Sequence, residues 1–148
     1  VQMPFVIRWP GHIKPGQRIE AMIQNIDYAP TFLDIAGLDI PADIQGRSLV
    51  PLLGGVTPEE WRDSIYYHYY HSGAYNLPKI EGGRNERYKL IRYYGHRKLD
   101  FGEQWELFDL EKDPQEMKSE YDNPEYAGIR RRMMKELKKL RKQYEVGE

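Results

Sequence analysis

The chain has 148 residues, of which 40% are hydrophobic and 13% aromatic. That is enough for one ordinary domain or for two small parts of a larger one, and it argues against a disordered chain. The formal net charge is -1 and no run of residues approaches the ~20 apolar positions of a membrane span, so neither nucleic acid nor a membrane is expected as a partner. Cysteine is absent, which excludes disulfides, thiolate zinc sites and a cysteine nucleophile in this chain.

The first predicted element is a strand over residues 4–9, a short apolar run with β-branched members that ends at a Pro-Gly pair. Because this strand begins almost at Val1, we expect the chain to be a fragment of a longer protein. A buried strand needs neighbours on both sides, so a severed one would leave an unpaired edge. Self-association of the fragment is therefore expected.

A short apolar helix comes next. Asp27 stands at the position of an N-cap, Pro30 falls in the first turn and Gly37 follows the last helical residue. One more helical turn is predicted near residues 48–53. We interpret residues 1–53 as the end of a large α/β domain that contributes one strand and one helix.

The composition changes at residues 54–61, which we interpret as a linker, and tyrosine becomes dense after them. Alternating patterns predict strands at residues 64–70, 87–94 and 105–110. The Gly, Pro and Asn content of residues 72–86 predicts a loop, with the Gly-Gly-Arg run near its end as a turn.

The last element is a long helix, which Asn123 can cap and for which Pro124 fits the first position. Its cationic residues are interpreted as a solvated helix face, because the acidic segment before the helix can neutralise their charge and cations late in a helix suit its dipole, so they do not indicate a nucleic-acid partner. Residues 62–148 thus predict a small α+β subdomain, an antiparallel sheet of about four strands packed on this helix. One apolar stripe recurs along the helix at spacings of three or four residues: Tyr126, Ile129, Met133, Leu137, Leu140 and Tyr144.

The chain contains no Gly-x-Ser-x-Gly nucleophile motif and no phosphate-binding loop. His68 and His71 are three positions apart, which on a strand points them to opposite faces, so they do not predict a metal site. The segment between residues 70 and 84 mixes aromatic, amide, imidazole and cationic side chains, which can stack on sugar rings and bind hydroxyls or anions. An ordinary hairpin loop remains the alternative. The candidate substrate-binding residues are His68, Tyr70, His71, Asn76 and Arg84.

Five phrases occur in a fixed order: MPFVIRWPGHIKPGQ, NIDYAPTFLDIAG, IQGRSLVPLL, RYKLIRYY and WELFDLEKDPQEM. Together they resemble the C-terminal portion of the sulfatases of the alkaline-phosphatase superfamily, and the chain is most similar to the bacterial arylsulfatase-like enzymes that act on sulfated glycans. The resemblance runs from Pro4 to about Tyr144. It gives the last phrase a structural role, as the final strand and turn of a small antiparallel subdomain.

Such sulfatases use a formylglycine, made from the Cys or Ser of a Cys/Ser-x-Pro-Ser-Arg motif, and a calcium ion held by Asp, Asn or His ligands. This sequence has neither a cysteine nor that serine motif, so the resemblance assigns no catalytic and no metal-binding residue to it. It implies that formylglycine and calcium belong to the rest of the sulfatase chain, that the substrate is a sulfated glycan, and that the fragment alone is inactive. A periplasmic or extracellular location is suggested by the same resemblance.

The resemblance also implies that residues 66–86 border the substrate cleft. Relatives carry a His-Tyr-Gly-Ile-Arg run there, whose arginine is matched by Arg84, whereas Ile80 and Glu81 replace its histidine and tyrosine. Two alternatives stay open. One is a phosphodiesterase or phosphonate hydrolase of the same superfamily, and the other is a non-catalytic carbohydrate-binding module.

Overall fold

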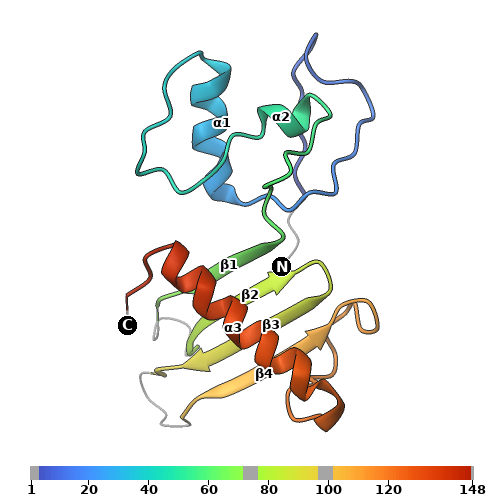
Figure 1. Ribbon diagram of the computed structural model, residues 1–148, viewed down its shortest axis with the longest axis vertical. Helices are drawn as coiled ribbons and strands as arrows, with labels where there is room; N and C mark the ends of the chain where they lie inside the picture. The colour runs from blue at the N-terminus through green and yellow to red at the C-terminus, as the bar shows by residue number, and fades with distance from the viewer. Residues whose placement is uncertain (1–3, 72–76, 97–101, 148) are drawn as a thin grey trace. The chain divides into compact units, whose positions relative to one another are not determined.

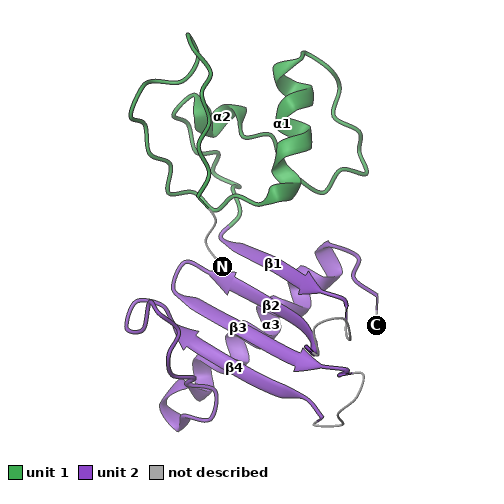
Figure 2. Ribbon diagram, turned by 180° about the vertical axis from the view of Figure 1, so that it is seen from behind, with its two compact units in different colours: residues 1–62 green, residues 63–148 purple. Residues whose placement is uncertain are grey.

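The structure, a computed structural model, describes residues 4–71, 77–96 and 102–147 (Figure 1). The chain divides into two compact units, unit 1 with residues 1–62 and unit 2 with residues 63–148 (Figure 2). No helix in the described ranges is long and apolar enough to cross a membrane.

Unit 2 is built on a four-stranded sheet in the order β1-β2-β3-β4. The strands are β1 (Ser64–Tyr69), β2 (Lys79–Asn85), β3 (Tyr88–Tyr94) and β4 (Gln104–Asp109). Each strand pairs antiparallel with the next one along the chain, so the sheet is a meander. The helix α3 (Ala127–Gln143) follows the 3-10 helix η2 (Pro124–Tyr126) and lies across one face of the sheet (Figure 1). The predicted α+β fold, a small antiparallel sheet on a long C-terminal helix, is confirmed.

The face of the sheet under α3 is filled by large apolar side chains. Leu90 of β3 and Leu107 of β4 are each 0% exposed, and they pack against Met133 and Leu137 of α3. The predicted apolar stripe of the helix therefore faces the sheet, where its burial removes apolar surface from water. Asn123 caps the start of η2 as predicted, because its side chain accepts a backbone N–H two residues further on at 3.0 Å.

The strand β2 corrects the sequence prediction, which assigned residues 72–86 to a loop. In the described part of this segment, Gly82 and Gly83 pair with both neighbouring strands in the middle of the sheet. A Cβ atom on Gly82 would lie 2.6 Å from the carbonyl oxygen of Leu90 and 2.6 Å from ring atoms of Tyr67. Glycine is needed here for close approach within a strand, and its presence was wrongly interpreted as a turn.

The phrase WELFDLEKDPQEM contains most of β4 and the turn that follows it, and it has the structural role that was expected. Trp105 and Leu107 face α3 and join its apolar cluster. Asp109 lies on the same face and is 2% exposed. Its carboxylate accepts hydrogen bonds from Nε and Nη2 of Arg87 at 3.0 and 2.9 Å and from the Tyr126 hydroxyl at 3.1 Å. The buried charge is therefore fully compensated, and it ties β4 to the hairpin and to η2.

Three acidic residues around β4 pair with cations on β3 or directly before it, and Glu120 pairs with Lys118 of its own segment. Within the described residues no ion pair joins this acidic segment to the cations of α3. The reason is the sheet order, because β3 lies beside β4 and its long cationic side chains reach the nearby carboxylates. The ion pairs are Lys89 with Glu116, Arg92 with Glu103 and Arg87 with Glu111.

Unit 1 contains η1 (Asn25–Asp27) and two α-helices, α1 (Tyr28–Ile35) and α2 (Val50–Leu53). The predicted short helix and the predicted helical turn near residues 48–53 are both present. Gly37 has a φ of 68° just after α1, which is the left-handed conformation that favours glycine at a helix end. Leu49, Leu52 and Leu53 form a small buried core. Trp61 belongs to the segment expected as a linker, and it packs against this core.

Asp27 has a different role from the predicted N-cap, because its side chain caps no N–H of α1. It is 0% exposed and forms a two-pronged ion pair with Arg62, whose Nη2 donates to Oδ1 at 2.7 Å. Its carboxylate also accepts the backbone N–H groups of Gln24 at 2.7 Å and Arg47 at 2.9 Å. This one residue thus joins three separate segments of unit 1.

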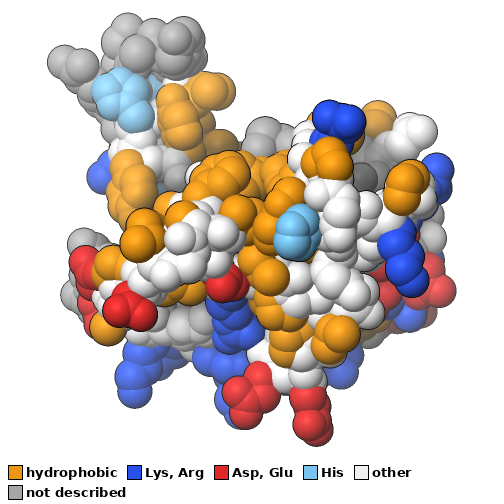
Figure 3. Space-filling model, turned by 90° about the horizontal axis from the view of Figure 1, so that it is seen from above, with side chains coloured by type: hydrophobic (Ala, Val, Ile, Leu, Met, Phe, Trp, Pro, Cys, Tyr) orange, Lys and Arg blue, Asp and Glu red, His pale blue; other side chains and the backbone are white. Residues whose placement is uncertain are grey.

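Residues 4–9 form no strand, and that prediction is wrong. The described part of unit 1 contains no strand with which they could pair. Two of these residues, Ile7 and Trp9, pack against the core instead, whereas Val6 is 92% exposed. Hydrophobic side chains are also exposed elsewhere on the surface (Figure 3), among them Phe32 at 65%.

Candidate functional site

Two of the predicted substrate-binding residues meet at the end of β1. His68 lies on the face of the sheet that carries α3, on the same side as Tyr66 two positions earlier. Tyr70 follows the strand, and its ring lies 3.6 Å from the His68 ring between centroids. His71 comes directly after Tyr70 and is exposed. His68, Tyr70 and His71 therefore form one short segment.

Arg84 is not part of this group. It lies on β2 three positions from Glu81, and Glu81 pairs directly with His68 in the sheet. Because side chains alternate along a strand, Arg84 points to the opposite face of the sheet. Asn76, the remaining candidate, lies outside the described residues.

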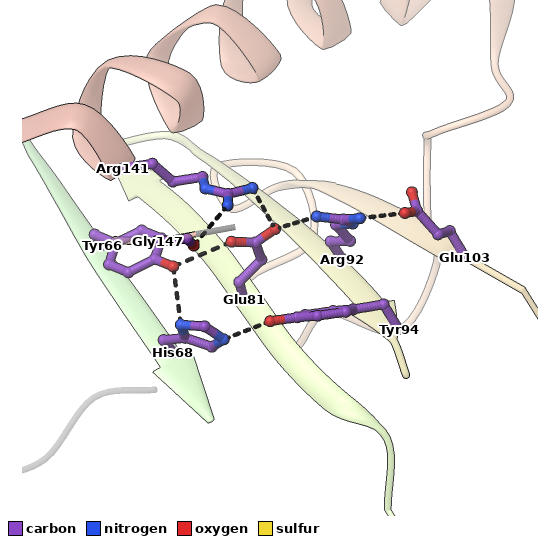
Figure 4. Close-up of polar contacts among 8 residues, drawn as sticks. All are labelled: Tyr66, His68, Glu81, Arg92, Tyr94, Glu103, Arg141 and Gly147. Carbon is purple, nitrogen blue, oxygen red and sulfur yellow. Dashed lines mark hydrogen bonds and ion pairs between the residues drawn. The ribbon is translucent and has the colours of Figure 1, made fainter. Parts of the chain in front are cut away.

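A buried carboxylate, Glu81, stands at the centre of the polar cluster beside His68 (Figure 4). Glu81 is 1% exposed, and it accepts hydrogen bonds from Nη1 of Arg92 at 2.7 Å and Nη1 of Arg141 at 3.3 Å. The Tyr66 hydroxyl donates to its other oxygen at 3.1 Å. Two guanidinium groups thus compensate the buried charge, and Arg92 continues to Glu103.

His68 links this carboxylate to the other tyrosine of the cluster. Its Nδ1 lies 3.2 Å from the Tyr66 oxygen and its Nε2 lies 2.6 Å from the Tyr94 oxygen. Since the Tyr66 hydroxyl donates to Glu81, its oxygen is left to accept, and the consistent arrangement protonates Nδ1. Tyr94 then donates to Nε2, so a neutral imidazole satisfies both of its nitrogens.

The pKa shifts agree with this neutral arrangement. Burial disfavours the imidazolium and lowers the pKa of His68 below its ordinary value of 6.5. Burial, reinforced by the negative charge of Glu81, raises the pKa of both Tyr66 and Tyr94 above 10.0. All three groups are therefore uncharged near neutral pH. In this arrangement His68, Tyr66 and Tyr94 form a neutral set of hydrogen-bond donors and acceptors.

Tyr70 is the accessible part of the site. Its side chain is 64% exposed, and His68 supports one side of the ring. An aromatic ring held in this way offers an apolar surface for the C–H face of a sugar, at little cost in conformational freedom. The arrangement can bind and orient a carbohydrate, and its chemistry is recognition.

Sequence reasoning missed the residues that hold His68: Tyr66, Glu81, Tyr94, Arg92 and Arg141. The register of the first hairpin contains the signal, because Glu81 stands directly opposite His68. That signal was lost when β2 was interpreted as a loop. The contribution of Arg141 comes from α3 (Figure 4), and no local pattern connects that helix to β2.

The residues present do not fit the calcium that the sulfatase resemblance implies for the intact enzyme. Among the described residues no three His, Asp or Glu side chains converge on a common point. The acidic residues near the site are already engaged by arginine, as Glu81 and Glu103 are. No ligand of calcium and no step through formylglycine is therefore assigned to these residues.

Comparison with known proteins identifies the family. A family model described as N-sulphoglucosamine sulphohydrolase, C-terminal, matches residues 1–143. The chain belongs to this family of C-terminal sulfatase domains. It is 42% identical over 146 residues to an N-acetylglucosamine-6-O-sulfatase of Bacteroides thetaiotaomicron, covering 97% of this chain and 25% of that protein.

Solved structures agree with the family. A protein described in complex with its substrate D-glucosamine-2-N,6-O-disulfate superposes with a TM-score of 0.88 and 40% identity, over 97% of this chain and 28% of that one. A phosphonate monoester hydrolase of Agrobacterium radiobacter matches less well, with a TM-score of 0.65 and 30% identity over 80% of this chain and 24% of that one. The chain thus spans about a quarter of the length of these relatives.

Proposed function

We propose that the chain forms the C-terminal part of a sulfuric ester hydrolase that removes sulfate from 6-O-sulfated glucosamine in sulfated glycans. The observation that carries this proposal is the identity of 42% to an N-acetylglucosamine-6-O-sulfatase along nearly the whole chain. The similarity to a protein whose substrate is a 6-O-sulfated glucosamine supports the same sugar. The partner of this chain is then the remainder of the sulfatase, which supplies formylglycine and calcium.

The sulfatase function is favoured over a phosphonate hydrolase. The TM-score of 0.88 for the glucosamine disulfate complex exceeds the values of 0.65 and 0.77 for two phosphonate monoester hydrolases, from Agrobacterium radiobacter and Silicibacter pomeroyi. Fold alone does not distinguish the two reactions. The higher sequence identity to the glucosamine disulfate complex, 40% against 30% and 26%, supports the sulfatase reaction.

Within this enzyme the group His68–Tyr70 borders the bound sugar. Tyr70 contributes the contact surface, and the uncharged His68 supports its ring at 3.6 Å between centroids, with the two planes tilted by 37°. The hydroxyls of Tyr66 and Tyr94 hold His68, and Glu81 in turn holds Tyr66. Binding through a rigid, supported ring loses little side-chain entropy, so such a contact favours affinity.

Enzyme kinetics of variants at the neighbouring positions Tyr69 and Tyr70 test this role. The protein used is the longest polypeptide that the reading frame of this chain encodes. Tyr70→Ala is expected to raise KM for N-acetylglucosamine 6-sulfate about three- to tenfold, because an aromatic contact contributes ~0.5–1.5 kcal/mol. Tyr69→Ala is the matched control, since Tyr69 is 38% exposed and points to the opposite face of β1. Equal effects of the two variants would contradict the role of Tyr70. Tyr70-dependent glycan binding without sulfate release would favour a carbohydrate-binding module.

A further inference from the structure

Unit 1 contains a pocket of about 450 Å³ between the loop at residues 12–18 and the end of α2. The walls from the loop include His12, Lys14 and Arg18, and Gly54 and Gly55 close the other side. The volume falls in the range of ~300–1,000 Å³ that is usual for small-molecule sites. This pocket is formed entirely within unit 1, and the site around His68 has no residue in it.

The charge of the pocket is of one sign. Lys14 and Arg18 bring two cationic groups to its wall, His12 brings an imidazole, and no Asp or Glu lines it. In a concave site of this kind the cationic groups reinforce each other's attraction for an anion. A guanidinium and an ammonium in the lining of one pocket are suited to a sulfate or carboxylate group, because arginine can bind such oxygens in two-pronged fashion.

Two features of the pocket favour the binding of an anion. The carbonyl groups at the C-terminal end of α2 would repel it, but the side-chain amide of Gln17 donates to the carbonyl oxygens of Leu52 and Leu53 at 3.2 and 3.3 Å. The rim is also ordered, since the His12 ring stacks on Trp9 with centroids 3.9 Å apart. The stacked pair adds an apolar surface next to the cationic wall.

We propose that this pocket binds the anionic group of an acidic sugar, a sulfate ester or a carboxylate, with Lys14 and Arg18 as its ligands. An acidic glycan carries such groups on successive residues, so the site would hold a part of the chain other than the one bound at Tyr70. The choice of a sugar rests on the proposed function, whereas the binding of an anion rests on the pocket alone.

The test is a titration of the ¹⁵N-labelled 148-residue chain, followed by NMR at constant ionic strength. The probes are sodium sulfate, glucosamine 6-sulfate, glucuronic acid and unsulfated N-acetylglucosamine. Both acidic sugars are expected to shift the backbone amides of Gly16, Gly54 and Gly55, and the unsulfated sugar is expected to bind at least tenfold more weakly. Binding of inorganic sulfate but of neither acidic sugar would overturn the proposal, as would equal binding of the unsulfated sugar.

Two double variants identify the ligands. Lys14→Ala with Arg18→Ala is expected to weaken binding of glucosamine 6-sulfate about tenfold or more, the loss typical of charged hydrogen bonds. The control, Lys135→Ala with Lys138→Ala, removes the same charge from exposed positions on α3 and is expected to change affinity less than twofold. Equal losses would overturn the proposal. Because the readout is binding, an enzyme without sulfatase activity whose pocket still binds would contradict the proposed function alone.

Discussion

Gly82 of β2 lies directly beneath the ring of Tyr67 on β1, where a Cβ atom would come within 2.6 Å of two ring atoms. The two residues are partners in the sheet register, and the missing side chain makes room for the ring. A glycine in mid-strand usually weakens a sheet. Here the close contact with an aromatic ring offsets that loss and explains how a Gly-Gly run can occupy a central strand.

Alanine at the two adjacent glycines should therefore have opposite effects. Gly82→Ala is expected to lower the free energy of unfolding by about 1–3 kcal/mol, the usual cost of overpacking. At Gly83 a Cβ would lie 3.4 Å from the nearest atom, Cδ1 of Leu140, so Gly83→Ala should be neutral or stabilise by up to ~1 kcal/mol. Urea unfolding followed by circular dichroism measures both. A loss at Gly83 as large as that at Gly82 would contradict the packing described.

The elements that could be predicted from the sequence are those whose signals are local. The helix α3 has its own apolar stripe, and Asn123 caps the turn η2 that leads into it; both signals act within a few residues. The strands β3 and β4 alternate clearly. By contrast, β2 contains a glycine in mid-strand because Tyr67 and Leu90 leave no space for a side chain at Gly82, and that information lies on other strands. Residues 4–9 have the composition of a strand but no partner strand in the described part of unit 1.

In the site, too, only the residues with a local sequence signal could be predicted. His68 and Tyr70 stand in one tyrosine-rich segment, and their side-chain types indicated recognition of a sugar. The residues around His68 were not predictable, because Glu81 stands opposite it across the hairpin and Arg141 reaches Glu81 from the terminal helix. Arg84 was included with the group from its position in sequence, but strand alternation puts it on the other face.

The lowered pKa of His68 predicts a pH dependence of stability. The unfolded imidazole titrates near 6.5, whereas burial keeps the folded one neutral to lower pH. The unfolded state thus binds a proton first, and stability should fall as the pH drops below about 6.5, down to the folded pKa. His68→Gln removes this titration and leaves His12, His71 and His96 as a common background. The urea concentration at the midpoint of unfolding should fall more between pH 7.5 and pH 5.5 in the wild type than in His68→Gln. Equal falls in the two proteins would contradict the lowered pKa of His68.

The tyrosines predict the behaviour at high pH. Burial raises the pKa of Tyr66, Tyr67, Tyr93 and Tyr94 above 10.0, so the folded state keeps these phenols neutral. A raised folded pKa means that their contribution to stability is complete below pH 10 and is lost as the pH rises further. Absorbance at 295 nm should show fewer than the 12 tyrosines ionised before alkaline unfolding. Titration of all of them in one step near pH 10 would refute this.

The buried ion pair of unit 1 predicts a large effect from one substitution. Asp27→Ala would leave Arg62, whose side chain is 5% exposed, without its partner, and an uncompensated buried charge costs about 3–5 kcal/mol. Asp39→Ala is the control, because Asp39 is exposed and such changes stay within ~0.5 kcal/mol. Both variants also carry Trp105→Phe, which removes the tryptophan of unit 2. Tryptophan fluorescence during denaturation then follows unit 1, since Arg62 lies 5.1 Å from the Trp61 ring centroid. A loss from Asp27→Ala no larger than that of the control would refute the role of the pair.

Sulfate release is the measurement that tests the central claim most directly. The longest polypeptide that the reading frame of this chain encodes would be incubated with N-acetylglucosamine 6-sulfate and, in parallel, with a phosphonate monoester. The account predicts release of inorganic sulfate from the sugar, faster than hydrolysis of the phosphonate ester. Hydrolysis of the phosphonate ester with no release of sulfate would contradict it.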